Sequence, residues 1–131
     1  MSTIFSKIIN KEIPSYTIAE NENFISFLDI NPLTVGHCLV VPKIEIDYLF
    51  DLDDSYLKEI LIFSKKISSS LSKTVDCVRV GVSVVGLEVP HAHLHLIPFI
   101  KEQDMSFSNK RIQMTNEEFL DLQSRIIKNL N

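Results

Sequence analysis

The chain is organised around one stretch, Val89-Pro90-His91-Ala92-His93-Leu94-His95-Leu96-Ile97-Pro98. Three of the four histidines in 131 residues lie here, at every second position. Residues two apart in a β-strand point to the same face of a sheet. Because prolines bracket the apolar run, a strand fits better than a helix. The spacing therefore predicts a strand that carries His91, His93 and His95 on one face.

Three interpretations of this row are open from the sequence. The plainest is a solvated strand face, and another is a zinc site, because imidazole is a common zinc ligand. At about 3.3 Å per residue, His91 and His95 would lie about 13 Å apart, which disfavours one shared ion. An adjacent pair could bind a metal only with further ligands from elsewhere. The third interpretation, which we favour, is histidine chemistry on an anion, with one imidazole as nucleophile and its neighbours as proton donors.

The composition indicates one globular domain over residues 1–131. A hydrophobic fraction of 45% is ordinary for such a domain, and no apolar run reaches membrane-spanning length. The formal net charge of −4 gives no support for binding to nucleic acid or to an anionic membrane. The N-terminus lacks the pattern of a secretory signal, and Cys38 and Cys77 each stand alone in apolar runs. We therefore expect a cytoplasmic protein with two buried free thiols.

Apolar spacing predicts the elements of the first half of the chain. Residues 4–9 have the pattern of a short amphipathic helix. Residues 16–19 and 24–28 have the pattern of two strands joined by a polar turn. Residues 37–42 follow a glycine as a third strand, and their near-continuous hydrophobicity indicates burial on both faces.

The second half adds a long helix, two more strands and a terminal helix. The acidic run 51–54 suits a helix N-terminus, with Asp53 or Asp54 as the cap, and serines 68–70 would let this helix end. Residues 76–85 predict a central strand, and residues 101–110 a mobile loop. Residues 115–118 fit a capping box before a helix that reaches residue 130. This order predicts an α+β fold with a mostly antiparallel sheet covered by helices.

In three stretches the chain resembles the histidine triad (HIT) family, and within it the Hint-like branch of nucleotide-binding phosphoramidases. The row of histidines fits the pattern His-x-His-x-His followed by apolar residues. Residues 27–32 with 36–43 fit a second block of the family, and residues 4–14 fit its N-terminal block. The resemblance implies a single HIT domain with a long central helix, a C-terminal helix, and a homodimer in which two sheets join.

The resemblance also implies a role for each histidine. In the family the middle histidine of the triad attacks the α-phosphate and forms a covalent nucleotidyl-histidine, which assigns the nucleophile here to His93. His95 and His91 would hold phosphoryl oxygens or pass a proton to the leaving group. His37 matches the family's remaining histidine, beside the nucleophile. Without the resemblance, His37 has the pattern of a satisfied core histidine in an apolar strand.

A nucleoside pocket follows from the same resemblance. Asp29 matches the residue whose carboxylate binds the ribose hydroxyls, although an aspartate before Asn31 and Pro32 also suits a turn. Gly86 and Glu88 would approach the phosphate through their backbone. The apolar walls around the base are implied at Ile4, Phe5, Ile8, Phe27 and Ile30. As a bare pattern, such a stripe is more often part of a core.

Two departures from the family pattern bear on the chemistry. Some relatives carry cysteines for a structural zinc where this chain has Ser6, so we predict no metal and no cofactor. Before the histidines, relatives usually carry polar amides where this chain has Val80 and Leu87. Each lost donor would weaken a charge-assisted bond to phosphate worth about 1.5–3 kcal/mol. Ser83 is the nearest side chain that could compensate.

We therefore predict an enzyme that hydrolyses or transfers the nucleotidyl group of a nucleoside monophosphate conjugate at a P–N or P–O bond. Purine phosphoramidates are the expected class. One alternative is a nucleotide-binding regulatory module with vestigial activity. Another is a metal-dependent hydrolase that uses an adjacent histidine pair with His37. The expected partner is a small-molecule nucleotide, not nucleic acid or a membrane.

Overall fold

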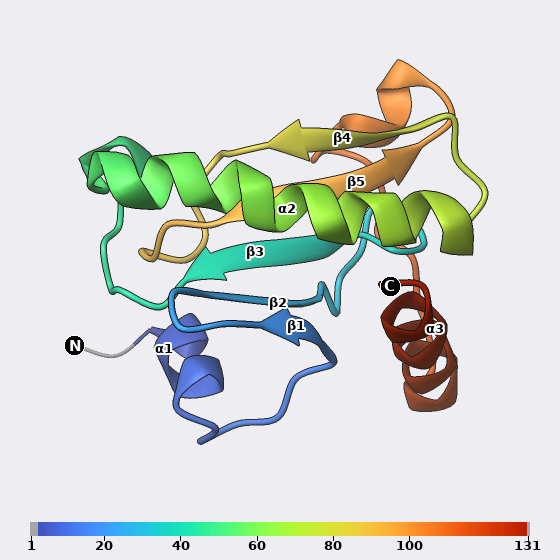
Figure 1. Cartoon of the computed structure of the whole chain (residues 1–131). Helices are drawn as coiled ribbons and strands as arrows, with labels where there is room; N and C mark the ends of the chain where they lie inside the picture. The colour runs from blue at the N-terminus through green and yellow to red at the C-terminus, as the bar shows by residue number, and fades with distance from the viewer. Residues whose placement is uncertain (1–2, 131) are drawn as a thin grey trace.

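The computed structural model describes residues 3–130. Its elements in chain order are α1 (Ile4–Ile9), β1 (Thr17–Glu20), β2 (Phe24–Leu28), β3 (Cys38–Pro42), η1 (Leu49–Asp51), α2 (Asp54–Thr74), β4 (Arg79–Ser83), β5 (Leu94–Phe99), η2 (Glu102–Met105) and α3 (Asn116–Lys128). Within these residues the strands form one antiparallel sheet in the order β1-β2-β3-β5-β4. The α2 helix lies across one face of the sheet, and α3 packs beside β1 (Figure 1). The predicted α+β class is confirmed.

The two faces of the sheet are both covered, but by different helices. On the α2 face the main core cluster includes Val40, Leu96 and Leu71. On the opposite face a smaller cluster joins Phe5 of α1 to Leu39 of β3. Successive residues of a strand point to opposite faces, and both faces are covered. The central strands β2 and β3 are therefore buried along their whole length, as predicted for residues 37–42.

The histidine stretch forms a shorter strand than its spacing predicts. β5 begins at Leu94, so His91 and His93 precede it in irregular chain. The chain bends over residues 87–91, where the His91 N–H donates to Val89 O at 2.8 Å. His95 lies opposite Leu39 of β3 and therefore shares the α1 face of the sheet.

The long helix α2 does not end at its serines. It continues to Thr74, because the hydroxyls along it find carbonyl acceptors inside the fold. Ser70 Oγ donates to Ile126 O of α3, and Thr74 Oγ1 donates to Ser70 O at 2.8 Å. Asp53 occupies the N-cap position of α2, but its side chain makes no capping hydrogen bond. The predicted capping box at residues 115–118 is confirmed at the start of α3.

Three further predictions are corrected by the structure. β4 is an edge strand, not a central one, because its β-branched residues pair only with β5 among the described residues. The segment 101–110, predicted as a mobile loop, contains η2, where Asp104 Oδ2 accepts from the N–H groups of Ile100 and Lys101. Cys38 is buried as predicted, whereas Cys77 is only half-buried. In residues 3–130 no helix combines the length and apolarity needed to cross a membrane.

Candidate active site

A cavity of about 320 Å³ opens on the α1 face of the sheet and contains two of the histidines. Its lining residues are Ile4, Phe5, Ile8, Ile13, Pro14, Ser15, Phe27, Leu28, Asp29, Ile30, Asn31, Leu39, Glu88, Val89, His93 and His95. Most of the predicted site residues are thus brought together. The exceptions are His37, His91 and Gly86, which do not line this cavity.

His93 is oriented by the backbone of its own triad. Its Nδ1 lies 2.7 Å from His91 O, and a carbonyl can only accept, so Nδ1 carries the proton. The neutral ring then keeps a free lone pair on Nε2. Burial is the main cause that lowers the pKa of His93, although the bond to His91 O opposes it. This side chain therefore combines the protonation state and the free nitrogen that a nucleophile needs.

His37 and His95 form a hydrogen-bonded pair whose proton positions can be assigned. The Leu33 N–H donates to His37 Nδ1 at 3.0 Å, so the neutral His37 ring carries its proton on Nε2. That Nε2 lies 2.9 Å from His95 Nδ1, which must then accept. His95 consequently carries its own proton on Nε2. Burial lowers the pKa of His37 to about 3 and that of His95 to about 4, so both rings are neutral at neutral pH.

His91 differs from the other two members of the row, because both of its ring nitrogens are used inside the fold. Its Nε2 lies 2.8 Å from Pro42 O, and its Nδ1 lies 3.0 Å from Thr3 Oγ1. The side chain is completely buried. The predicted contact of His91 with phosphoryl oxygens is therefore corrected: this residue anchors α1 to the end of β3.

Asp29 lies at the edge of the cavity next to the paired histidines. Its Oδ1 accepts from the Asn31 N–H at 2.8 Å, which satisfies the turn interpretation. Its Oδ2 lies 3.5 Å from His37 Nε2, a polar contact and not an ion pair, because His37 is neutral. Burial raises the pKa of the Asp29 carboxyl, opposed by the Asn31 hydrogen bond and by the charge of Arg111.

Asp29, His37 and His95 are also the one group of potential metal ligands found in residues 3–130, with ligand atoms within 4.8 Å of one another. The fit to a cation is poor in this arrangement. His37 Nε2 and His95 Nδ1 are hydrogen-bonded to each other, so a proton lies where an ion would need both lone pairs. The absence of a bound metal remains a prediction.

The apolar walls of the cavity serve as core and pocket at once. Phe5, Ile8 and Phe27 are buried in the cluster on the α1 face, and the Phe5 and Phe27 rings meet edge to face at 5.6 Å. Ile4 and Ile30 line the same cavity but are mostly exposed, at its rim. The Ile/Phe stripe therefore belongs to the core and also lines the cavity, and its contact with a base stays a prediction.

The segment before the histidines is exposed and apolar. The Leu87 side chain is 88% exposed, so it contributes nothing to the cavity, and Val80 packs against the main core. A Cβ added to Gly86 would meet no atom within 4 Å, and the φ of +76° explains the glycine there without any ligand. Ser83 lies opposite His95 in the sheet, which makes it the polar residue of β4 nearest the site.

Sequence reasoning missed Phe107, whose ring lies 4.8 Å from the His95 ring and 6.4 Å from that of His37. It also missed Arg111, whose guanidinium lies 5.6 Å from the Phe107 ring. Both residues belong to irregular chain after η2, where neither strand nor helix periodicity marks a side chain as facing inward. No signal in one sequence alone would have identified them.

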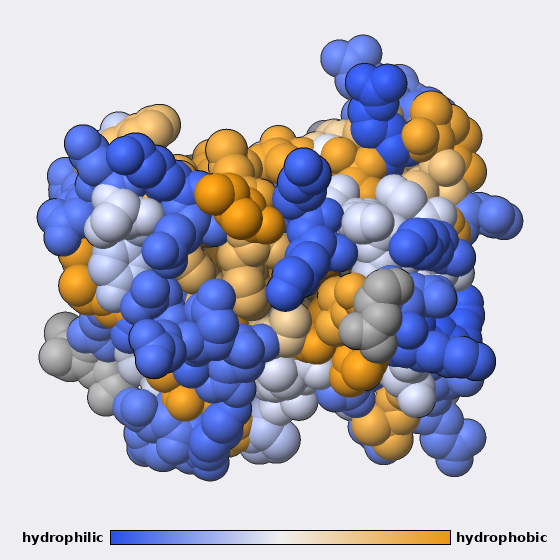
Figure 2. Space-filling view, in the orientation of Figure 1, coloured by the Kyte–Doolittle hydropathy of each residue, from blue (hydrophilic) through white to orange (hydrophobic). Residues whose placement is uncertain are grey.

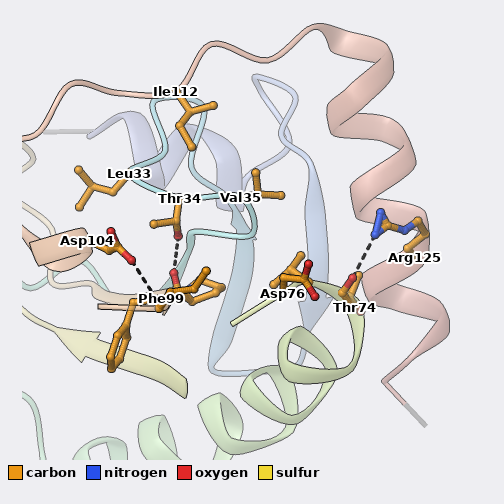
Figure 3. Close-up of a pocket in the computed structure, with 12 residues that line it drawn as sticks. Leu33, Thr34, Val35, Thr74, Asp76, Phe99, Asp104, Ile112 and Arg125 are labelled. Carbon is orange, nitrogen blue, oxygen red and sulfur yellow. Dashed lines mark hydrogen bonds between the residues drawn. The ribbon is translucent and has the colours of Figure 1, made fainter. Parts of the chain in front are cut away.

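A larger hollow of about 600 Å³ lies elsewhere, between the C-terminal ends of α2 and β5 and the α3 helix. Two of its polar side chains are bonded to nearby backbone (Figure 3): Thr34 Oγ1 donates to Pro98 O at 2.6 Å, and Arg125 Nη2 donates to Thr74 O at 3.1 Å. None of the described residues that line it is a histidine or a cysteine. We therefore place the candidate chemistry in the smaller cavity.

Comparison with known proteins agrees with this geometry. Residues 10–102 match the HIT domain family. The chain is 38% identical to an uncharacterized HIT-like protein of Borreliella burgdorferi, over 97% of each chain. It is 35% identical to adenosine 5'-monophosphoramidase HNT1 of Saccharomyces cerevisiae, over 72% of this chain and 61% of that protein. A crystal structure of a Hit-like protein involved in cell-cycle regulation from Bartonella henselae, with an unknown ligand, matches at a TM-score of 0.83 and 28% identity, covering 98% of this chain and 96% of that one. The chain belongs to the HIT domain family.

Proposed function

We propose that this HIT domain protein is a nucleotide hydrolase that cleaves a P–N or P–O bond of a nucleoside monophosphate conjugate, with purine phosphoramidates as the expected class. The observation that carries the proposal is the bond from His93 Nδ1 to His91 O, which leaves a lone pair on Nε2 of a neutral imidazole beside the cavity. The name of the yeast relative, a monophosphoramidase, supports the same class of substrate.

The proposed reaction has two displacements. His93 Nε2 attacks the α-phosphorus, so a bond from phosphorus to imidazole forms and the bond to the leaving amine breaks. The amine takes one proton from solvent as it leaves. Water then attacks phosphorus, the bond to His93 breaks, and the nucleoside monophosphate and one proton are released. Over the two steps, one water is consumed for each conjugate cleaved.

His95 and His37 act in this scheme as a fixed donor to the phosphoryl group. Because His37 keeps the His95 proton on Nε2, that N–H is available to a phosphoryl oxygen on which charge develops. The low pKa of His95, about 4, favours this hydrogen-bonding role over the delivery of a proton to the leaving group. His37 is then a positioning residue, and Asp29 is left to bind the ribose hydroxyls.

The test is to trap the covalent intermediate. The protein is mixed with adenosine phosphoramidate, quenched in base and digested, and the peptide that contains His93 is examined by mass spectrometry. We expect one adenylyl group on that peptide in the wild type, and none in His93→Gln. Full turnover by His93→Gln would contradict the role assigned to His93.

A second candidate function is a nucleotide-binding module with vestigial activity. The exposure of Leu87 and the core packing of Val80 favour it, because neither position offers a polar side chain to phosphate. Under this alternative, calorimetry detects nucleotide binding in the wild type while turnover stays near the rate without protein. It predicts that His93→Gln leaves this residual turnover unaltered.

We also propose that two copies join through β4. This edge strand exposes Val82, the residue just before it, Val78, is also exposed, and α2, which contacts β4, exposes Leu61 and Ile62. Figure 2 shows such apolar side chains between polar ones over α2. An uncovered apolar edge of this kind favours strand pairing with a second copy. Sedimentation should give a dimer that Val82→Lys weakens and the matched Val35→Lys, at an exposed valine elsewhere, does not.

A further inference from the structure

A cation, Arg111, lies beside the candidate site on a segment beyond the matched residues 10–102 of the family. Between η2 and α3 the chain returns past the turn that follows Asp29. Arg111 Nη1 donates to Asn31 O at 2.8 Å, and the Ile112 N–H donates to Pro32 O at 2.9 Å. These two bonds fix the guanidinium at this edge of the site.

Rings in contact connect α1 to this segment. The Phe5 ring centroid lies 5.0 Å from that of His93, and His93 lies 5.0 Å from His95. His95 lies 4.8 Å from Phe107, and the Arg111 guanidinium carbon lies 5.6 Å from the Phe107 centroid. Since Phe5 belongs to the apolar pocket, Arg111 lies at the other end of the row, beyond the two histidines proposed to face phosphorus.

The charge around the cavity calls for a cation at this end. Asp29 and Glu88 line the cavity, and none of its lining residues within 3–130 is a lysine or an arginine. The histidines supply no positive charge, because burial lowers the pKa of His93 and of His95. A phosphate substrate would therefore meet two carboxylates without compensation. The charge of Arg111 acts on this region: it opposes the rise that burial causes in the pKa of Asp29, and it adds to the fall that burial and His93 cause in the pKa of His95.

We propose that Arg111 is a specificity-determining residue that binds an anionic group on the substrate's leaving group. A guanidinium has five N–H donors, and in residues 3–130 the only hydrogen bond found for it is the one to Asn31 O. The remaining donors match a carboxylate or a phosphate. The inference rests on the proposed function and deepens it. The substrate is a nucleoside monophosphate joined either through nitrogen to an amino acid or through oxygen to a second phosphate.

The experiment compares two pairs of substrates, each with an anionic and an uncharged leaving group. One pair is the adenosine phosphoramidate of alanine and its methyl ester; the other is ADP and unsubstituted adenosine phosphoramidate. For each pair, the ratio of kcat/KM for the anionic to the uncharged leaving group is measured in wild type, Arg111→Gln and Lys110→Gln. Lys110→Gln is the matched control, because it removes the same charge from the preceding residue, which is exposed.

We expect Arg111→Gln to lower at least one ratio about tenfold, as for the loss of one charge-assisted hydrogen bond, and Lys110→Gln to lower neither. The pair that responds identifies the anion as a carboxylate or a phosphate. Equal ratios in wild type and Arg111→Gln would overturn the proposal, as would an equal fall in Lys110→Gln.

Failure of the proposed function is distinguished by binding. Calorimetry needs no turnover, so it can be done in the His93→Gln background. There it measures the dissociation constants of ADP and AMP, with and without the additional Arg111→Gln substitution. If Arg111→Gln lowers the preference for ADP over AMP about tenfold, the role of Arg111 is supported even if no substrate is cleaved. An unaltered preference together with unaltered kinetic ratios contradicts it. Circular dichroism melting shows that each variant is folded.

Discussion

His91 and His95 flank the same residue at equal spacing, yet the fold uses them in opposite ways. Both nitrogens of His91 are bonded to groups of α1 and β3, and its side chain is sealed from solvent. His95 has one nitrogen bonded to His37 and lines the cavity, which leaves the other for a ligand. The comparison teaches that period-two spacing selects a face, whereas the partner of each ring nitrogen decides between structural and chemical roles.

The largest contrast is expected between His93→Ala and His91→Ala. His93→Ala removes the proposed nucleophile, so turnover should fall about 1000-fold or more while the free energy of unfolding falls by about 1 kcal/mol. His91→Ala leaves Pro42 O and Thr3 Oγ1 without their buried partner, and should cost about 3 kcal/mol of unfolding free energy. Urea unfolding and phosphoramidate turnover measure the two effects. If His91→Ala is as stable as the wild type, His91 does not have the structural role assigned to it.

A sharper test concerns His37, which acts on His95 only through a proton. His37→Leu removes the donor to His95 Nδ1, so the His95 ring can take the other tautomer and kcat should fall about 100-fold. His37→Gln can place an amide N–H near the same point and should recover part of this loss. We expect KM to vary less than kcat in both variants. Equal kcat in the two variants would show that bulk, not the donor, is what matters.

The smallest effect for a single side chain is expected from pH. The folded pKa values of His37 and His95, about 3 and about 4, lie below the unfolded value of about 6.5. Between these values the unfolded chain binds protons that the folded chain does not, so stability falls as pH falls below about 6.5. For each ring that stays neutral in the folded chain, the free energy of unfolding at pH 5 should be about 2 kcal/mol lower than at neutral pH.

The measurement is urea unfolding at pH 7 and pH 5 for wild type and His37→Gln. The variant has one buried histidine fewer and should lose less stability on acidification. Turnover adds a second readout, because the lowered pKa of His93 should move the acid limb of kcat/KM below pH 6.5. An acid limb at or above that pH would mean that His93 is not the buried neutral base described here.

The strands and the histidine face could be predicted because their information is local. β2 lies where a short apolar run predicted a strand, and the period-two spacing indicated that His93 and His95 share one side, where both line the cavity. The end of α2 could not be predicted, since Ser70 is satisfied by a carbonyl of α3 that is distant in sequence. The position of His91 outside the cavity could not be predicted either, because it depends on hydrogen bonds to Thr3 and Pro42, which are distant in sequence.

The least predictable part of the site is the segment after η2. Phe107 lies against the histidines and Arg111 lies against Phe107, because the Arg111 guanidinium and the Ile112 N–H bond this irregular chain to Asn31 O and Pro32 O. Both bonds end on backbone carbonyls, which leave no signature in the sequence, so only the folded chain reveals them. The position of β4 at the edge is similar, because β-branched residues indicate a strand but not its place in the order.

Main-chain groups set the protons on three of the four imidazoles: Leu33 N–H on His37, His91 O on His93 and Pro42 O on His91. Substitution of a side chain by any residue except proline deletes neither a backbone N–H nor a carbonyl, so these proton positions are robust to mutation wherever the backbone path is kept. Substitutions at the pocket rim, Ile4 and Ile30, are therefore expected to alter substrate preference without altering these proton positions. Gly36, with a φ of +95° and only 3.1 Å between a Cβ and Pro98, is where variation would instead disturb the backbone next to His37.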